Sequence, residues 1–200
     1  MDLVRAWLGR DRGLSSAPVV ALAIAGIAAL MVVALLLLGR SLWCACGYVA
    51  LWHGDVWSDQ NSQQLTDPYT FTHVTHGFVF YVALRLFAGG LSLGTRAVLA
   101  TALESTWEVL ENTSTIIDRF RTATIALQYY GDSVVNSLGD VAAALLGFWL
   151  AARLPTWLSI AAVLVLEVGL ALWIRDNFVL NVVMLIAPIE AVRQWQQGGG

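Results

Sequence analysis

Residues 17–39 of the chain read APVVALAIAGIAALMVVALLLLG, a run without a single charged side chain. At 1.5 Å per residue this run makes about 35 Å of helix, and the hydrocarbon core of a bilayer is about 30 Å thick. The run is too long for the apolar core of a signal peptide, and no small-residue cleavage site follows it. We therefore expect a retained transmembrane helix, and this run decides the fold class.

The composition of the whole chain agrees with a membrane protein. It has 200 residues, of which 58% are apolar and 12% are charged, whereas soluble domains carry about 25% charged residues. The net charge is −3, and no basic patch stands out, so a nucleic-acid partner is not favoured. Membrane lipid is the expected partner.

Further apolar runs follow the first one along the chain. We predict an all-α integral membrane bundle of about six transmembrane helices. The later spans are expected at 71–90, 93–117, 132–154 and 155–174. A last run at 178–189 is about 18 Å of helix, so it is a short sixth span, a re-entrant segment or a surface helix. The predicted organisation is a tail over 1–16, one membrane domain over 17–195 with an external loop at 40–70, and a flexible tail over 196–200.

The distribution of arginine gives an orientation. The amino-terminal tail holds Arg5, Arg10 and Arg12, whereas the loop at 40–70 is acidic. By the positive-inside rule the amino terminus is cytoplasmic and the loop is external. Two further basic residues then fall outside, against the rule, which suggests an anionic substrate or a buried ion pair near them. They are Arg119 and Arg121.

Three of the predicted spans carry ionisable or amide side chains at helical spacing. One such charge at the bilayer centre costs about 2.5–3.5 kcal/mol on insertion scales, so the groups should face one another, water or a cation. With the predicted helix directions they also lie at similar depth, in the outer half of the membrane. These groups are His73 and His76, then Glu104, Glu108 and Glu111, then Asp132, Asn136 and Asp140.

A divalent cation accounts for this set most simply, because imidazole nitrogens and carboxylate oxygens from facing helices build metal sites. The expected ligands are His73, His76, Glu108 and Asp132. Glu104 or Glu111 would be the general base, and Asn136 and Asp140 complete the candidate catalytic residues. The candidate substrate-binding residues are Arg119, Arg121, Tyr130 and Arg175.

The polar set is also compatible with two roles that need no metal. Neighbouring carboxylates can share protons and act as a relay or as an acid–base pair. They can also pair with arginines and hold helices together. The two cysteines, Cys44 and Cys46, are expected to be free thiols, because a bridge between them closes a very small ring.

Several motifs resemble a bacterial multi-pass inner-membrane family of unknown function, domain of unknown function twenty-five eighty-five. They are DPYTFTHVTHGF at 67–78, ESTWEVLEN at 104–112, YYGDSVVNS at 129–137 and the stretch from IRDN at 174–177 through residue 186. The resemblance covers roughly residues 39–196. It implies a multi-pass protein of the bacterial inner membrane and no particular activity. Small bundles with Asp and Asn on late helices also give a looser likeness to VanZ-type membrane proteins.

From these residues we predict a membrane enzyme that depends on a divalent metal. It would hydrolyse a lipid or lipid-linked substrate, or transfer a group to it, at the external interface. A small proton- or ion-coupled transporter is an alternative, although the chain shows no internal repeat of the kind that carriers have. An accessory subunit of a membrane complex, with a purely structural polar cluster, is the third hypothesis.

Overall fold

The computed structural model describes residues 16–124 and 128–198. Over these residues the chain forms eight helices and no strand, so the predicted all-α class is confirmed. The helices are α2 (Ala17–Leu37), α3 (Thr70–Phe87), α4 (Leu93–Glu111), α5 (Ser114–Ala123), α6 (Val134–Arg153), α7 (Thr156–Ile174), α8 (Phe178–Ile186) and α9 (Glu190–Gln196). The predicted tail over 1–16 lies, except for its last residue, outside the described residues.

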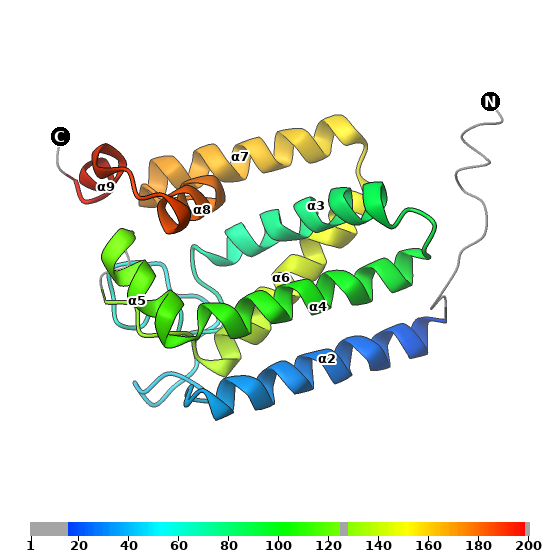
Figure 1. Ribbon diagram of the computed structural model, residues 1–200, viewed down its shortest axis with the longest axis horizontal. Coiled ribbons are helices and arrows are strands. Elements are labelled where there is room, and N and C mark those ends of the chain that lie inside the picture. The colour runs from blue at the N-terminus through cyan, green and yellow to red at the C-terminus, as the bar shows by residue number, and fades with distance from the viewer. Residues whose placement is uncertain (1–15, 125–127, 199–200) are drawn as a thin grey trace.

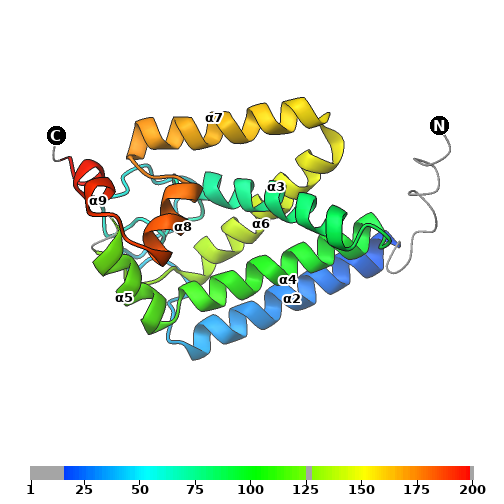
Figure 2. The same ribbon diagram turned by 45° about the horizontal axis from the view of Figure 1, so that its top comes forward.

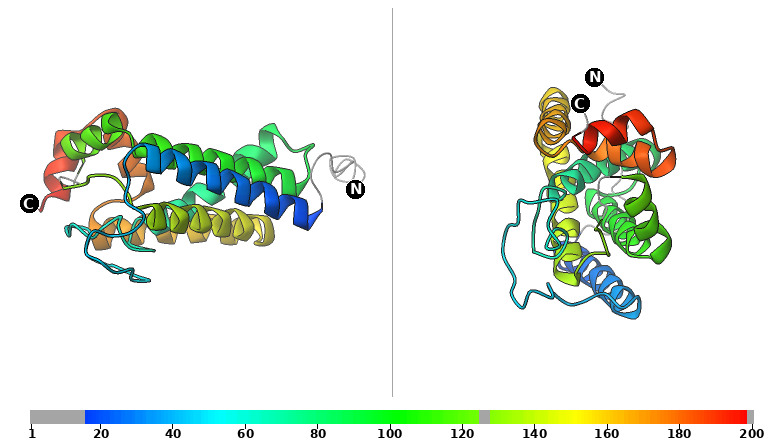
Figure 3. Two further views of the ribbon diagram at one scale, coloured as in Figure 1. Left: turned by 90° about the horizontal axis from the view of Figure 1, so that it is seen from below. Right: turned by 90° about the vertical axis from the view of Figure 1, so that its left-hand side faces the viewer.

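The long helices run side by side, with α2 and α7 on opposite sides of the bundle (Figure 1). Helix α3 packs mainly on α6, and α4 packs on both α2 and α6. Turning the molecule shows α4 lying along α2 and α6 crossing beneath α3 (Figure 2). The polar loop between α2 and α3 and the short helices α5, α8 and α9 gather at one end of the bundle (Figure 3). That end also receives the start of α3, the end of α4 and the start of α6.

Three of the described helices are long and apolar enough to cross a membrane, namely α2, α6 and α7. Side chains such as Leu22, Leu37 and Leu172 are at least 74% exposed, and apolar surface of this kind needs a lipid or protein partner. The predicted count of six spans is not confirmed. Helices α3 and α4 are long enough but more polar, and the nine residues of α8 make only about 14 Å of helix.

The expected third span at 93–117 is wrong at its end, because α4 stops at Glu111. Asn112 ends the helix. Its side-chain Nδ2 donates to the Glu108 carbonyl at 2.9 Å and to Asp132 Oδ2 at 2.6 Å. Asparagine competes with the helical backbone in this way. Arg119 and Arg121, expected outside the membrane beyond this span, belong to the separate helix α5.

Glycines let α3 and α6 touch along their backbones. A Cβ atom added at Gly77 would collide with the Ala144 carbonyl oxygen, and one at Gly147 with the Val74 carbonyl oxygen. Only glycine permits this separation. The close contact fixes the position of α3, and with it the position of the two histidines in its first turns.

Two smaller expectations are also corrected. Cys44 and Cys46 form a disulfide rather than two free thiols, because the turn closed by the Gly47 N–H on the Cys44 carbonyl brings them together. Gln196, assigned to a flexible tail, is buried in α9, where its Nε2 donates to Asp176 Oδ1 at 3.1 Å.

Candidate metal centre

The polar side chains of three helices meet at the loop-covered end of the bundle. Two sets of potential metal ligands have donor atoms within 4.8 Å of one another. The first set is His73, His76 and Glu104, and the second is His73, Glu108 and Asp140. The predicted coincidence in depth therefore brings these residues into contact, although α3, α4 and α6 are far apart in sequence. His73 belongs to both sets.

Glu104 joins the two histidines. Its carboxylate lies 2.5 Å from His73 Nδ1 and 2.9 Å from His76 Nδ1, and it is completely buried. His73 and His76 are neighbours on one face of α3, with ring centres 4.8 Å apart. Sequence reasoning assigned Glu104 as a base, whereas the geometry also makes it a possible ligand.

The second set contains a carboxylate with no hydrogen bond among the described residues. Both oxygens of Glu108 are buried and unpartnered, and the nearest imidazole atom, His73 Nδ1, is 3.5 Å away. Asp140 Oδ2 lies 3.8 Å from His73 Nε2, and Asp140 Oδ1 accepts a hydrogen bond from Thr70 Oγ1 at 3.1 Å. A buried charged group normally finds partners, so Glu108 indicates that a proton or a cation is part of this site.

Asp132 lies in the same region but outside both ligand sets. Gly131, at a φ of +98°, turns the chain just before it, and Asp132 Oδ2 accepts hydrogen bonds from Tyr129 OH at 2.9 Å and from Asn112. Burial raises the pKa of Asp132 to about 6, while the hydrogen bonds from Tyr129 and Asn112 act to lower it. Its assignment as a metal ligand stays a prediction.

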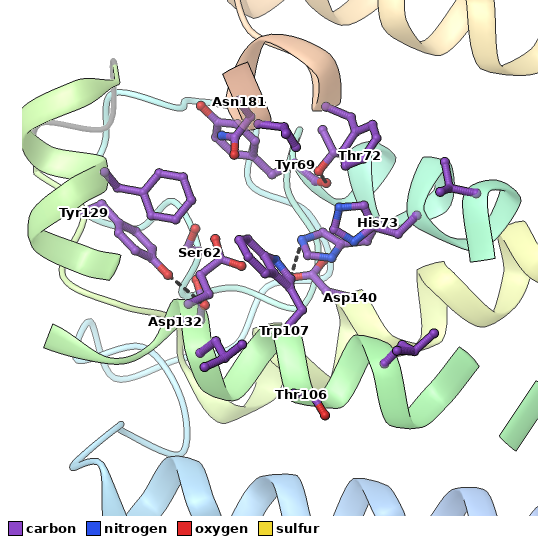
Figure 4. Close-up of a pocket in the computed structure, with 18 of the residues that line it drawn as sticks. Ser62, Tyr69, Thr72, His73, Thr106, Trp107, Tyr129, Asp132, Asp140 and Asn181 are labelled. Atoms are coloured by element: carbon purple, nitrogen blue, oxygen red, sulfur yellow. Dashed lines mark hydrogen bonds and ion pairs between the residues drawn. The ribbon is translucent and has the colours of Figure 1, made fainter. Parts of the chain in front are cut away.

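A cavity of about 360 Å³ opens beside these residues (Figure 4). Tyr129 and Asp132 lie at one side of it in the view, and His73 and Asp140 lie at the other, with Trp107 between them. The lining residues come from the polar loop, from α3, α4, α5, α6 and α8, and from the segment between α5 and α6. They are Asn61, Ser62, Tyr69, Thr72, His73, His76, Val79, Phe80, Leu103, Thr106, Trp107, Leu110, Glu111, Phe120, Tyr129, Asp132, Asp140, Phe178, Asn181 and Val182.

Asn136, a predicted catalytic residue, does not line this cavity. Its Nδ2 donates to the Gln64 carbonyl at 2.9 Å, and its backbone N–H donates to Ser133 Oγ at 3.1 Å. These bonds tie the start of α6 to the polar loop. The structure therefore gives Asn136 a role in holding the loop.

The predicted substrate-binding residues also lie away from the cavity wall. Arg119 donates from Nε to the Leu185 carbonyl at 2.8 Å, and Arg121 is exposed on α5. Tyr130 OH donates to the Asp59 carbonyl at 3.0 Å, and Arg175 NH1 donates to the Trp195 carbonyl at 3.0 Å. Arg119, Tyr130 and Arg175 therefore donate hydrogen bonds to backbone carbonyls of the protein itself.

Arg119 holds the end of α8, which leads to a prediction. The guanidinium bonds the carbonyls of both Leu185 and Ile186, and a cation at a helix carboxyl terminus is stabilising. Arg119→Gln should cost about 1–3 kcal/mol locally, as expected for hydrogen bonds from a charged group. Amide hydrogen exchange in α8 should then quicken about tenfold. Arg121→Gln, the same change at an exposed site on the same helix, should leave that exchange as in the wild type, and equal rates in both variants would contradict the assignment.

Sequence reasoning missed the contribution of the polar loop. Asp67 is buried and accepts backbone hydrogen bonds from Ser62 and Tyr69, each at 2.8 Å. Burial raises the pKa of Asp67. Tyr69 OH in turn donates to Asp176 Oδ2 at 3.2 Å, across 107 residues of chain. The Asp67-Pro68 pair before α3 was the available signal in the sequence. Such a pair predicts a turn, and it does not reveal that the loop forms part of the cavity wall.

Comparison with known proteins gives the family. The family model described as "Protein of unknown function (DUF2585)" matches residues 35–198. The chain belongs to this family. The expected resemblance is thus confirmed, and the match covers every residue of the two ligand sets.

Relatives with similar sequences occur in several bacteria. A UPF0314 protein of Paracoccus denitrificans (strain Pd 1222) is 55% identical over 163 residues, which are 81% of this chain and 84% of the relative. UPF0314 protein R03235 of Rhizobium meliloti (strain 1021) is 47% identical over 177 residues, 88% of this chain and 90% of the relative. No solved structure matches the chain.

Proposed function

We propose that this member of the DUF2585 family is a membrane-embedded, metal-dependent hydrolase or transferase that acts on a lipid or lipid-linked substrate. One observation carries the proposal. Side chains of α3, α4 and α6 place two sets of ligand atoms within 4.8 Å of one another, beside a cavity whose wall is largely apolar.

The charges of the cluster favour a cation. Glu104, Glu108 and Asp140 are each at most 4% exposed, and only two imidazoles are near enough to offset them among the described residues. Burying carboxylates without compensation is expensive. A divalent ion would supply the missing positive charge, and it would also give the free oxygens of Glu108 a partner.

The donor atoms suit a transition metal or zinc, since imidazole and carboxylate both bind such ions. A bound ion of this kind polarises an acyl or phosphoryl oxygen or lowers the pKa of a water molecule. Among the residues of the protein, His76 and Glu111 are less buried than Glu108 and line the cavity. We propose that Glu111 exchanges a proton with a group bound there.

We also propose how the bundle sits in the bacterial inner membrane. Helices α3 and α4 would cross it together with α2, α6 and α7, and the amino terminus would be cytoplasmic. The loop-covered end of the bundle would then face outward. Residues 41–70 of that loop contain no arginine or lysine, which supports this orientation because basic residues are the ones retained on the cytoplasmic side.

A metal-free acid–base site is the second candidate. The contacts of Glu104 with both histidines favour it, because they satisfy that carboxylate without an ion. A histidine oriented by a carboxylate is a common general base. This candidate leaves the two free oxygens of Glu108 without a partner unless Glu108 is protonated.

Metal titration of the purified protein separates the two candidates. We expect the chelator-treated protein in detergent to bind Zn²⁺ or Mn²⁺ with near-integral stoichiometry and to gain thermal stability as the ion is added. Glu108→Gln should weaken binding at least tenfold. Asp176→Asn is the matched control, because Asp176 is equally buried but lies outside both ligand sets, and its affinity should stay that of the wild type. Absence of binding, or equal losses in both variants, would favour the acid–base site.

A further inference from the structure

The cavity has a second polar end, distinct from the two ligand sets. Asp132 and Glu111 line it, and Tyr129 OH bonds Asp132 Oδ2 at 2.9 Å. Burial, followed by the negative charges of Asp132 and Glu111, raises the pKa of Tyr129 well above its usual value. Tyr129 and Asp132 lie together on the side of the cavity away from His73 (Figure 4), and Glu111 lines the same cavity.

Three carboxylates line the cavity wall, together with the imidazoles of His73 and His76. Glu111, Asp132 and Asp140 line it, and no arginine does so among the described residues. Two arginines near the cavity are bound to backbone carbonyls outside it: Arg119 donates to carbonyls of α8, and Arg40 donates to the carbonyl of Tyr130. A divalent ion between Glu104, Glu108 and Asp140 would leave the pair Glu111 and Asp132 without an arginine partner on the cavity wall. An anionic head group would be repelled at this end, and a cationic one would be attracted.

The same wall is rich in aromatic rings. Such rings attract ammonium groups placed over their faces, by about 0.5–2 kcal/mol each. Phe120 and Tyr129 form an edge-to-face pair at the acidic end, with ring centres 5.4 Å apart. The aromatic lining residues are Tyr69, Phe80, Trp107, Phe120, Tyr129 and Phe178.

An apolar opening leads from the cavity to the outer surface of the bundle. Val79 on α3 and Leu103 and Leu110 on α4 all line the cavity. They are nevertheless 43%, 47% and 50% exposed. They lie on helices that would cross the bilayer in the proposed orientation. A hydrocarbon chain could leave the cavity between α3 and α4 without entering water.

We propose that the substrate is a cationic amphiphile, whose ammonium group lies between Glu111 and Asp132 and whose hydrocarbon chain leaves the cavity between α3 and α4. The reaction of this substrate rests on the proposed function, whereas its binding does not. It replaces the anionic head group that the sequence suggested, because the arginines on which that idea depended do not reach the cavity.

Photolabelling with matched probes tests the proposal. Three probes share a dodecyl chain with a diazirine and differ only in the terminal group, which is an amine, a hydroxyl or a phosphate. The wild-type protein is labelled in an uncharged maltoside detergent, and labelled peptides are mapped by mass spectrometry. We expect the amine probe to label residues 79–110 at least tenfold more than the phosphate probe, with the hydroxyl probe between them.

Charge variants show whether the acidic end causes the preference. Glu111→Gln should reduce the ratio of amine to phosphate labelling to about threefold or less. Glu190→Gln, which removes a carboxylate from the exposed part of α9, should leave the ratio unchanged. Equal or stronger labelling by the phosphate probe would overturn the proposal. So would a preference that survives Glu111→Gln, or labels that map away from α3 and α4.

Metal content measured in the same samples keeps this result separate from the proposed function. A metal-bound protein without the amine preference would contradict the substrate inference but not the proposed metal-dependent reaction. A metal-free protein with the preference would support the cationic amphiphile and overturn the metal-dependent reaction.

Discussion

Replacing His73 by alanine is expected to remove metal binding completely, whereas His76→Ala should spare part of it. His73 is a member of both ligand sets, and His76 belongs only to the set that contains Glu104. Loss of His76 leaves His73, Glu108 and Asp140, which still offer three ligands. We therefore expect no measurable binding in His73→Ala, and a weaker site or a smaller number of ions in His76→Ala. Titration of each purified variant, with elemental analysis, measures the difference.

A general loss of structure could imitate this result, so the fold must be measured alongside it. His73→Ala also takes a partner from Glu104 and Glu108, which lie buried on α4, and part of its effect will appear as lower stability. His73→Gln retains a donor that can reach Glu104 and should fold better, yet it lacks the imidazole. His53→Ala, at the third histidine of the chain in the polar loop, should bind metal normally. Equal metal binding by His73→Gln and the wild type would contradict the assignment of His73 as a ligand.

Positions along the chain were sufficient to predict which helices share the polar cluster. His73 lies near the start of α3, Glu108 near the end of α4, and Asp140 in the second turn of α6. Because successive helices of a bundle alternate in direction, these positions fall at the same end. Helical spacing fixed the shared face within each helix, since residues three and four apart lie one above another.

The contacts that each side chain makes within the cluster could not be predicted in the same way. Whether Glu104 or Asp132 reaches His73 depends on helix rotation and on side-chain rotamers, which the packing of α3 against α6 decides. Asp132 precedes α6 and is held by Asn112, a contact that follows from the break between α4 and α5. Nothing in the hydrophobic pattern of 93–117 reveals that break.

The predicted position of Arg119 was wrong for a related reason. Arg119 was expected on the external side as a candidate substrate-binding residue. The amphipathic segment 114–123 folds as α5 instead, and α5 turns Arg119 toward the carboxyl end of α8. Contacts between short helices at the end of a bundle depend on how the loops close, so a single sequence carries little information about them.

The second large effect is expected at the contact between α3 and α6, where Gly147→Ala should destabilise the protein while Gly169→Ala does not. The added methyl group at 147 would collide with the Val74 carbonyl oxygen, whereas nothing lies within 4 Å at 169. Overpacking of this kind costs about 1–3 kcal/mol or more. In a helix without such a contact, alanine is more favourable than glycine by about 0.5–1 kcal/mol. The two identical substitutions should therefore shift the thermal unfolding midpoint in detergent in opposite directions.

The effect at Gly147 should also reach the candidate metal centre. Val74 is the residue next to His73 on α3, so a methyl group that pushes the two backbones apart would move His73 away from Asp140 on α6. The distance of 3.8 Å between His73 Nε2 and Asp140 Oδ2 would lengthen, and metal affinity would fall in Gly147→Ala although no ligand is changed. Gly169→Ala should keep the affinity of the wild type. An unchanged unfolding midpoint in Gly147→Ala would show that α3 and α6 are not in backbone contact. A lower midpoint with unchanged metal affinity would show that the position of His73 does not depend on that contact.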